Sequence, residues 1–159
     1  MKTRIAYVDH ADQIGGAEKS LLELVAHLDS ERFEPVVMHQ PGAQWVPDEA
    51  DARFVAAVPP SDLYDDRRGD LDGGLLGNVR RAVKAAGLVR RLRGQMQSLQ
   101  PDIVHTNSTK MHLIAGAAAR LCRLPVVWHM RDLLTEPGAR GWLARGVRRV
   151  GPEVIAISE

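Results

Sequence analysis

The stretch Gly15-Gly16-Ala17-Glu18-Lys19-Ser20 decides the fold of this chain. It follows the apolar run Ile5-Ala6-Tyr7-Val8 and leads into residues 21–28, where leucine and valine recur at helical spacing. A strand, a glycine pair and a helix start, in that order, place free backbone N–H groups at a helix N-terminus. The helix dipole favours an anion there, and glycine lets a phosphate or sugar approach the backbone closely. A plain tight turn is the alternative explanation of the glycines.

Length and composition indicate one globular domain. The chain has 159 residues, 45% of them hydrophobic, and its formal net charge of +1 gives no overall attraction to nucleic acid. Its single cysteine, Cys122, excludes an internal disulfide and is typical of a reducing compartment. We find no apolar run of roughly 18 residues and no signal-peptide pattern. We therefore expect a cytoplasmic protein with Cys122 in its core.

Strand and helix patterns alternate along the chain. We expect strands at 4–9, 33–38, 53–57, 102–106, 125–129 and 153–157, and helices at 17–29, 78–99, 109–122 and 139–149. Short, continuous apolar runs indicate parallel strands covered on both faces. The pattern predicts a doubly wound, mostly parallel, Rossmann-like α/β sheet with helices on both faces. The segment 58–77, rich in proline, glycine and acidic residues, is expected to be a long loop.

Polar residues follow three of the expected strands at their carboxyl ends, where doubly wound sheets bind ligands. They are Asp9, His10, Asp12, Gly15 and Gly16 after the first strand, His105, Asn107 and Ser108 at the fourth, and His129, Arg131 and Asp132 at the fifth. In a Rossmann-like strand order the first strand neighbours the fourth, and the fifth lies beside the fourth, at about 4.8 Å per step. We therefore expect these three loops to converge on one crevice.

Histidines are the first candidates for chemistry. His129 leaves an apolar strand, so it could transfer a proton or contact a charge, although a core histidine bonded to backbone is the alternative. His10 and His105 could line the crevice, whereas His27 and His39 have the pattern of surface positions. No pair of histidines has zinc spacing with a third ligand nearby, so we expect no metal site.

Four ordered segments resemble the N-terminal half of GT-B glycosyltransferases of the family-4 type, which are similar to glycogen synthases and mannosyltransferases. They are Gly15–Ser20, Pro101–Ser108, Val126–Asp132 and Val154–Glu159. The resemblance implies the acceptor-side domain of a retaining enzyme that transfers a hexosyl group from a nucleotide-diphosphate sugar to an acceptor, without metal or other cofactor. It also implies a C-terminal donor-binding domain that residues 1–159 do not include, and hence an inactive chain when isolated.

The same resemblance implies roles for individual residues. His129 matches the histidine that approaches the transferred sugar and is the expected catalytic residue. Gly15 and Gly16 match the pair that faces the donor phosphate or the acceptor. Asn107 and Ser108 lie in the loop that helps shape the acceptor side.

The sequence leaves two interpretations open for each of three charged residues. Arg131 and Asp132 could contact the donor or acceptor, or could form a local ion pair. Glu18 could line the crevice, or could simply favour the dipole at the helix N-terminus.

Other function classes fit less well or stay as alternatives. A nucleotide-binding oxidoreductase needs G-x-G-x-x-G after the first strand, and a P-loop enzyme needs G-x-x-x-x-G-K-[ST]; both patterns are absent. A non-catalytic, flavodoxin-like binding module and one half of a sugar-nucleotide epimerase remain open.

Positive charge is concentrated in two segments, 78–100 and 138–149, that contain no acidic residue. The first holds Arg80, Arg81, Lys84, Arg90, Arg91 and Arg93, and the second holds Arg140, Arg145, Arg148 and Arg149. In the first helix, Val79, Val83, Leu88, Leu92, Met96 and Leu99 form an apolar stripe. Such helices are either solvated surface elements with a core stripe or surfaces that meet anionic lipid at the inner face of a membrane.

Overall fold

The computed structural model describes residues 1–48, 52–64, 74–131 and 137–156. Within them lie the strands β1 (Thr3–Val8), β2 (Phe33–His39), β3 (Arg53–Ala56), β4 (Ile103–Thr106), β5 (Val126–Met130) and β6 (Glu153–Ala156). The helices are α1 (Gly16–Ala26), α2 (Gly74–Leu99), α3 (Thr109–Leu121) and α4 (Pro137–Val150), with a 3₁₀ turn at Asp62–Tyr64. Every strand and helix expected from the sequence is present, with ends shifted by a few residues.

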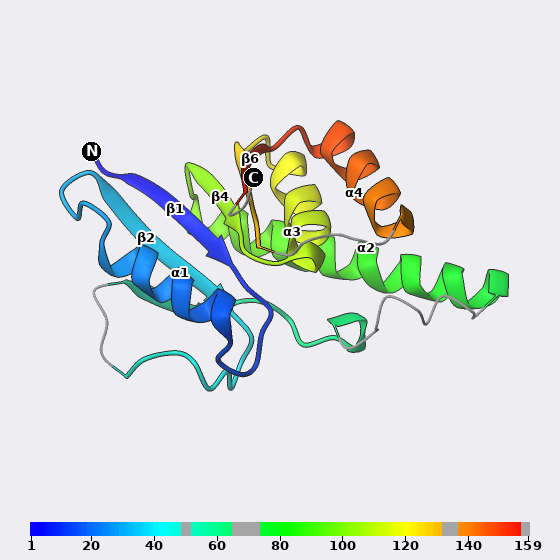
Figure 1. The fold of residues 1–159 in the computed structure, drawn as a ribbon, viewed down its shortest axis with the longest axis horizontal. Coiled ribbons are helices and arrows are strands. Elements are labelled where there is room, and N and C mark those ends of the chain that lie inside the picture. The colour runs from blue at the N-terminus through cyan, green and yellow to red at the C-terminus, as the bar shows by residue number, and fades with distance from the viewer. Residues whose placement is uncertain (49–51, 65–73, 132–136, 157–159) are drawn as a thin grey trace.

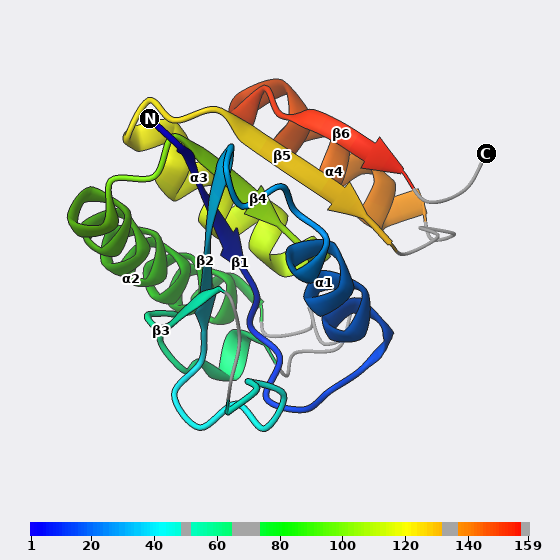
Figure 2. The same ribbon diagram turned by 90° about the vertical axis from the view of Figure 1, so that its left-hand side faces the viewer.

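The strands form one parallel sheet in the order β3-β2-β1-β4-β5-β6. Figure 2 shows β4, β5 and β6 side by side in this sheet. The chain reverses its direction of winding between β1 and β4, which are neighbours although their sequences lie far apart. This is the Rossmann-like order, and it confirms the doubly wound sheet.

Alternating side chains divide the core into two layers. Ala6, Val8 and Trp128 point toward the face covered by α2, α3 and α4, whereas Tyr7 points toward the face that α1 covers. The two apolar layers explain why the strands read as continuous hydrophobic runs. Cys122 is only half-buried against the first layer, because it follows the end of α3.

Helix α4 packs closely over α3 and β5. A Cβ on Gly146 would lie 2.5 Å from Cδ2 of Leu113 and 3.0 Å from the ring of Trp128. Glycine is therefore needed at this point for the helix to lie against the indole ring. Trp128 itself is fully buried.

The expected loop 58–77 is too long. Helix α2 already begins at Gly74, a 3₁₀ turn occupies Asp62–Tyr64, and residues 65–73 lie outside the described part. The two glycines at 74 and 77 cost a helix only about 1 kcal/mol each, and no proline follows Pro60 in this segment to stop it.

Candidate functional site

The carboxyl ends of β1, β4 and β5 form a polar row beneath α1. Thr106 pairs with Val8 on one side and with Trp128 on the other, so the next residue of each strand, Asp9, Asn107 and His129, follows in register. The alternation of strand side chains directs this row toward the face that α1 covers. The predicted convergence of the three loops is thus realised in the backbone pairing.

A buried carboxylate anchors the row. The Asn107 amide donates from Nδ2 to Oδ2 of Asp9 at 2.9 Å and to the carbonyl of Ala17 at 3.1 Å. The other carboxylate oxygen of Asp9 accepts from the N–H of Ala11 at 2.9 Å. Asp9 is 0% and Asn107 2% exposed, so both amide and carboxylate are occupied inside the protein. Three segments, the β1 end, the β4 end and the first turn of α1, are tied together here.

Arg131 links this anchor to His129. Its Nε donates to Oδ1 of Asn107 at 2.7 Å, and its Nη2 lies 3.2 Å from Nδ1 of His129. A guanidinium only donates, so Nδ1 accepts and the ring proton resides on Nε2. Burial, together with Arg131, lowers the pKa of His129. The geometry therefore presents a neutral imidazole that can donate from Nε2.

Two carboxylates lie near the guanidinium of Arg131, although burial has the larger effect on its pKa. Burial lowers the pKa of Arg131, while Asp9 and Glu18 raise it. A guanidinium stays protonated under these influences. The half-buried site therefore holds a permanent positive charge beside the N-terminus of α1, where the helix dipole adds to it.

The glycine loop has a more specific structure than the sequence pattern predicts. The N–H of Gly15 donates to Oε2 of Glu18 at 2.7 Å, and a Cβ on Gly15 would lie 2.9 Å from that oxygen. Glu18 is buried and caps the helix through this bond. Gly16 is exposed, and a Cβ there would meet no atom within 4 Å. Of the two glycines, Gly16 thus leaves open space at the helix start.

His10 and Ser108 lie beside the row. Oγ of Ser108 is 3.0 Å from Nδ1 of His10, and Ser108 makes no side-chain cap to α3. His10, Asp12 and Ser61 line a polar hollow of about 670 Å³ next to the loop after β1. His10 is therefore partly buried at the edge of this hollow, and its expected place in the crevice stays a prediction.

The remaining histidines differ in their surroundings. His105 is buried against Tyr7, with ring centroids 4.8 Å apart, and lies 5.4 Å from the ring of His129. Burial above all, with the nearby His129 and Arg131, lowers the pKa of His105 to about 3. His105 therefore backs His129 from within and does not line an open crevice.

The surface prediction holds for one histidine and fails for another. The side chain of His27 is 79% exposed. His39 is buried, because Trp45 and Phe54 pack against its ring and its Nδ1 donates to the Gln40 carbonyl at 2.7 Å. Trp45 lies in the loop after β2, and the sequence pattern does not predict where this loop packs.

Two further observations complete the site. Asp132 lies outside the described residues. Among the residues that the structure describes, no group of three His, Cys, Asp or Glu side chains could hold a metal ion. The sequence groups Asp9 with the polar residues of the converging loops but does not predict its role as the buried anchor, although an acid directly after a buried strand at the switch point is a usable signal.

The fold is that of a domain found in GT-B glycosyltransferases of known structure. The chain is similar to a glycosyltransferase from Rickettsia africae, with a TM-score of 0.65, 16% identity and coverage of 99% of this chain and 37% of that one. It is similar to MurG of Acinetobacter baumannii (TM-score 0.62, 17% identity, 90% and 39% coverage). It is also similar to Anabaena HepE in complex with UDP and glucose (TM-score 0.58, 16% identity, 92% and 36% coverage). The chain spans less than half the length of each of these structures.

The sequence identifies the family. The model of Glycosyltransferase Family 4 matches residues 14–159, and the chain belongs to that family. No curated protein sequence matches the chain. Within the described residues, no helix combines the length and the apolarity needed to cross a bilayer.

Proposed function

We propose that the chain is the N-terminal, acceptor-side domain of a retaining enzyme that transfers a hexosyl group from a nucleotide-diphosphate sugar to an acceptor. The observation that carries this proposal is the contact of Arg131 with His129 at the carboxyl end of β5, next to the β1–β4 switch point and the start of α1. The family membership and the UDP and glucose in the HepE structure support it.

His129 is the residue we propose to act in the transfer. Its Nε2–H can donate to an oxygen of the transferred sugar, while Arg131 holds Nδ1. Such a donor stabilises charge that develops on the sugar or on the leaving group. Asn107, buried and fully bonded, contributes by holding Arg131, and Ser108 with His10 forms the neighbouring acceptor side.

The N-terminus of α1 is the proposed contact for the donor phosphates. Gly16 leaves room for close approach, and Arg131 adds a positive charge nearby. We propose that these groups, without a metal ion, neutralise the departing diphosphate. Addition of EDTA to the assay tests this point, because a metal-dependent transfer would stop.

The proposal includes a second, donor-binding domain that follows this one. A departing nucleotide diphosphate needs donors from both walls of a cleft, and the described residues supply one wall. The chain covers 37% of the Rickettsia glycosyltransferase, which leaves room for such a domain. On this account residues 1–159 alone transfer no sugar.

The direct experiment compares residues 1–159 with the full-length protein, using UDP-glucose and other nucleotide-diphosphate hexoses with candidate acceptors. We expect product only from the full-length protein, with the anomeric configuration of the donor retained, as read by NMR. Turnover by residues 1–159, or an inverted product, would contradict the proposal.

We also propose peripheral association with an anionic membrane at its inner face. Leu76, Val79 and Val83 are 85%, 53% and 67% exposed, and they share one face of α2 at positions i, i+3 and i+7. The expected apolar stripe is thus buried only from Leu88 onward, because the first turns of α2 extend beyond the sheet (Figure 1). The exposed Arg80 lies on the same turns, and each basic residue near an anionic surface contributes about 1 kcal/mol.

Vesicle co-sedimentation tests this association. We expect binding to phosphatidylglycerol vesicles that weakens with salt and is lost in the double variant Val79→Asp/Val83→Asp. The double variant Gln97→Asp/Ser98→Asp, which adds the same charge to exposed positions on the same helix, is the control for charge. Equal binding to neutral and anionic vesicles would overturn the membrane proposal.

A further inference from the structure

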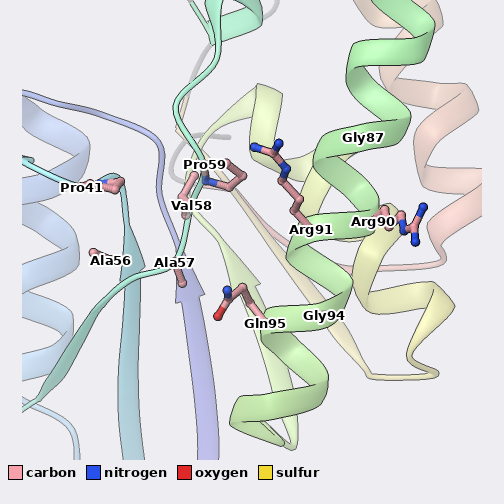
Figure 3. A pocket seen from close by; sticks show the side chains of 10 residues that line it. All are labelled: Pro41, Ala56, Ala57, Val58, Pro59, Gly87, Arg90, Arg91, Gly94 and Gln95. Carbon is pink, nitrogen blue, oxygen red and sulfur yellow. The ribbon is translucent and has the colours of Figure 1, made fainter.

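A second hollow, which shares no residue with the site described above, lies between the end of β3 and the middle of α2 (Figure 3). Its volume is about 640 Å³, within the range of small-molecule sites. Ala57 and Val58, 8% and 0% exposed, form its apolar floor, and prolines lie at its rim. We call it the α2 groove.

The helix wall of the α2 groove is unusually open. Gly87 and Gly94 lie seven residues apart and so face the same side, and a Cβ on either would meet no atom within 4 Å. Between these glycines, Arg91 extends toward Pro59, and Gln95, the residue after Gly94, extends toward Ala57 (Figure 3). Arg90 also borders the groove, but its guanidinium points away from it in the same view.

The groove offers hydrogen-bond donors without charged acceptors. None of its described lining residues is acidic, and α2 has no Asp or Glu over its whole length. Arg91 is exposed and makes no hydrogen bond or ion pair with another described residue. The guanidinium of Arg91 and the amide of Gln95 can bind an anionic group. The apolar floor below them can contact the less polar remainder of the same ligand.

The opposite wall of the groove is held in place. Val58 is buried, and its N–H donates to the carbonyl of His39 at 3.0 Å. A few residues further on, Asp62 pairs with Lys84 of α2. The segment between these anchors therefore keeps its distance from the helix, and the hollow exists before any ligand arrives.

We propose that the α2 groove binds the phosphate group of an organic phosphate, with Arg91 as the charged contact and Gln95 as a second donor. The phosphate could belong to a soluble phosphorylated compound or to a phospholipid headgroup, which share this chemistry. The site shares no residue with the proposed sugar-transfer site, so failure of the sugar-transfer proposal would not affect it.

Titration of the chain with glycerol 3-phosphate, followed by two-dimensional NMR, tests the soluble source. Arg91→Gln is expected to weaken binding by about 10-fold, as for loss of a hydrogen bond to a charged group. Arg90→Gln removes the same charge from the same helix and should change binding little. Gly94→Leu should block the groove, whereas Gly77→Leu, which adds the same bulk to α2 outside it, should not. Melting temperatures identify any variant that fails to fold.

Co-sedimentation with phosphatidylglycerol vesicles tests the lipid source with the same four variants. If the soluble phosphate does not bind, we expect Arg91→Gln and Gly94→Leu, and not their controls, to weaken vesicle binding. Either pattern supports the groove, and the two patterns distinguish its ligand. The proposal would be overturned by equal losses in Arg91→Gln and Arg90→Gln in both experiments, because general surface charge would then explain the binding. Unchanged binding by Gly94→Leu in both experiments, or no binding of the wild-type chain in either, would also overturn it.

Discussion

Nη2 of Arg131 lies 3.2 Å from Nδ1 of His129, two residues earlier on the same segment. Because arginine cannot accept, this contact selects the imidazole tautomer with its proton on Nε2. The contact depends in turn on Asn107, whose Oδ1 accepts a hydrogen bond from Nε of Arg131. Asn107, which follows β4, thereby orients the side chain of His129 on β5 through Arg131.

The first prediction concerns the ionisation of His129. Burial and Arg131 both lower its pKa, so Arg131→Leu should raise the pKa toward the ordinary value. The titration of His129 by NMR, in residues 1–159, measures the change.

His105 on β4 and Arg131 itself are the other titratable groups that face this ring among the described residues, with Asp9 and Glu18 next to Arg131. Arg120→Leu, on the exposed end of α3, is the control, and an unshifted His129 in Arg131→Leu would show that the contact does not form in solution.

The second prediction concerns stability against pH. The pKa of His105 is lowered to about 3, so the folded state resists the proton that the unfolded chain binds below about pH 6.5. The His105 contribution to the free energy of unfolding should fall by about 1.4 kcal/mol per pH unit as the pH drops from 6 to 4. Urea unfolding at several pH values measures the slope.

His105→Gln should flatten this slope, whatever its stability at neutral pH. His27→Gln is the control, because it also removes one histidine, but from an exposed position. Its free energy of unfolding should vary with pH as in the wild type. A slope that is the same in all three proteins would mean that His105 is protonated freely in the folded state.

The third prediction tests the packing of α4. Gly146→Ala should destabilise the fold by about 1–3 kcal/mol, since the new methyl would meet Leu113 and the ring of Trp128. Gly141→Ala in the same helix meets no atom within 4 Å and should stabilise by up to about 1 kcal/mol. Thermal or urea unfolding measures whether each substitution raises or lowers the free energy of unfolding. Equal effects of the two substitutions would place α4 elsewhere.

Much of the fold follows from local patterns. The continuous apolar strands and the periodic helices predict the elements to within a few residues, and the winding rule then puts β1 beside β4. The convergence of the polar loops needs only this strand order. His129 and Arg131 could therefore be grouped with Asn107 before any side chain was placed.

The interactions within the site could not be predicted in the same way. The bond between Asn107 and Asp9 joins residues 98 positions apart, and it depends on side-chain directions that only the packed sheet defines. The burial of His39 depends on Trp45, which reaches back from a loop without periodicity. The exposure of Val83 depends on how far α2 extends past the sheet, which an apolar stripe does not reveal.

The central claim is that His129 acts in the transfer of a sugar, and the turnover number of the full-length protein tests it most directly. His129→Ala should lower kcat by about 10²–10⁴, the usual range for a positioned proton donor. His27→Ala, which removes an exposed histidine from the same domain, should leave kcat unchanged. A full-length His129→Ala protein that folds and retains the kcat of the wild type would contradict the account.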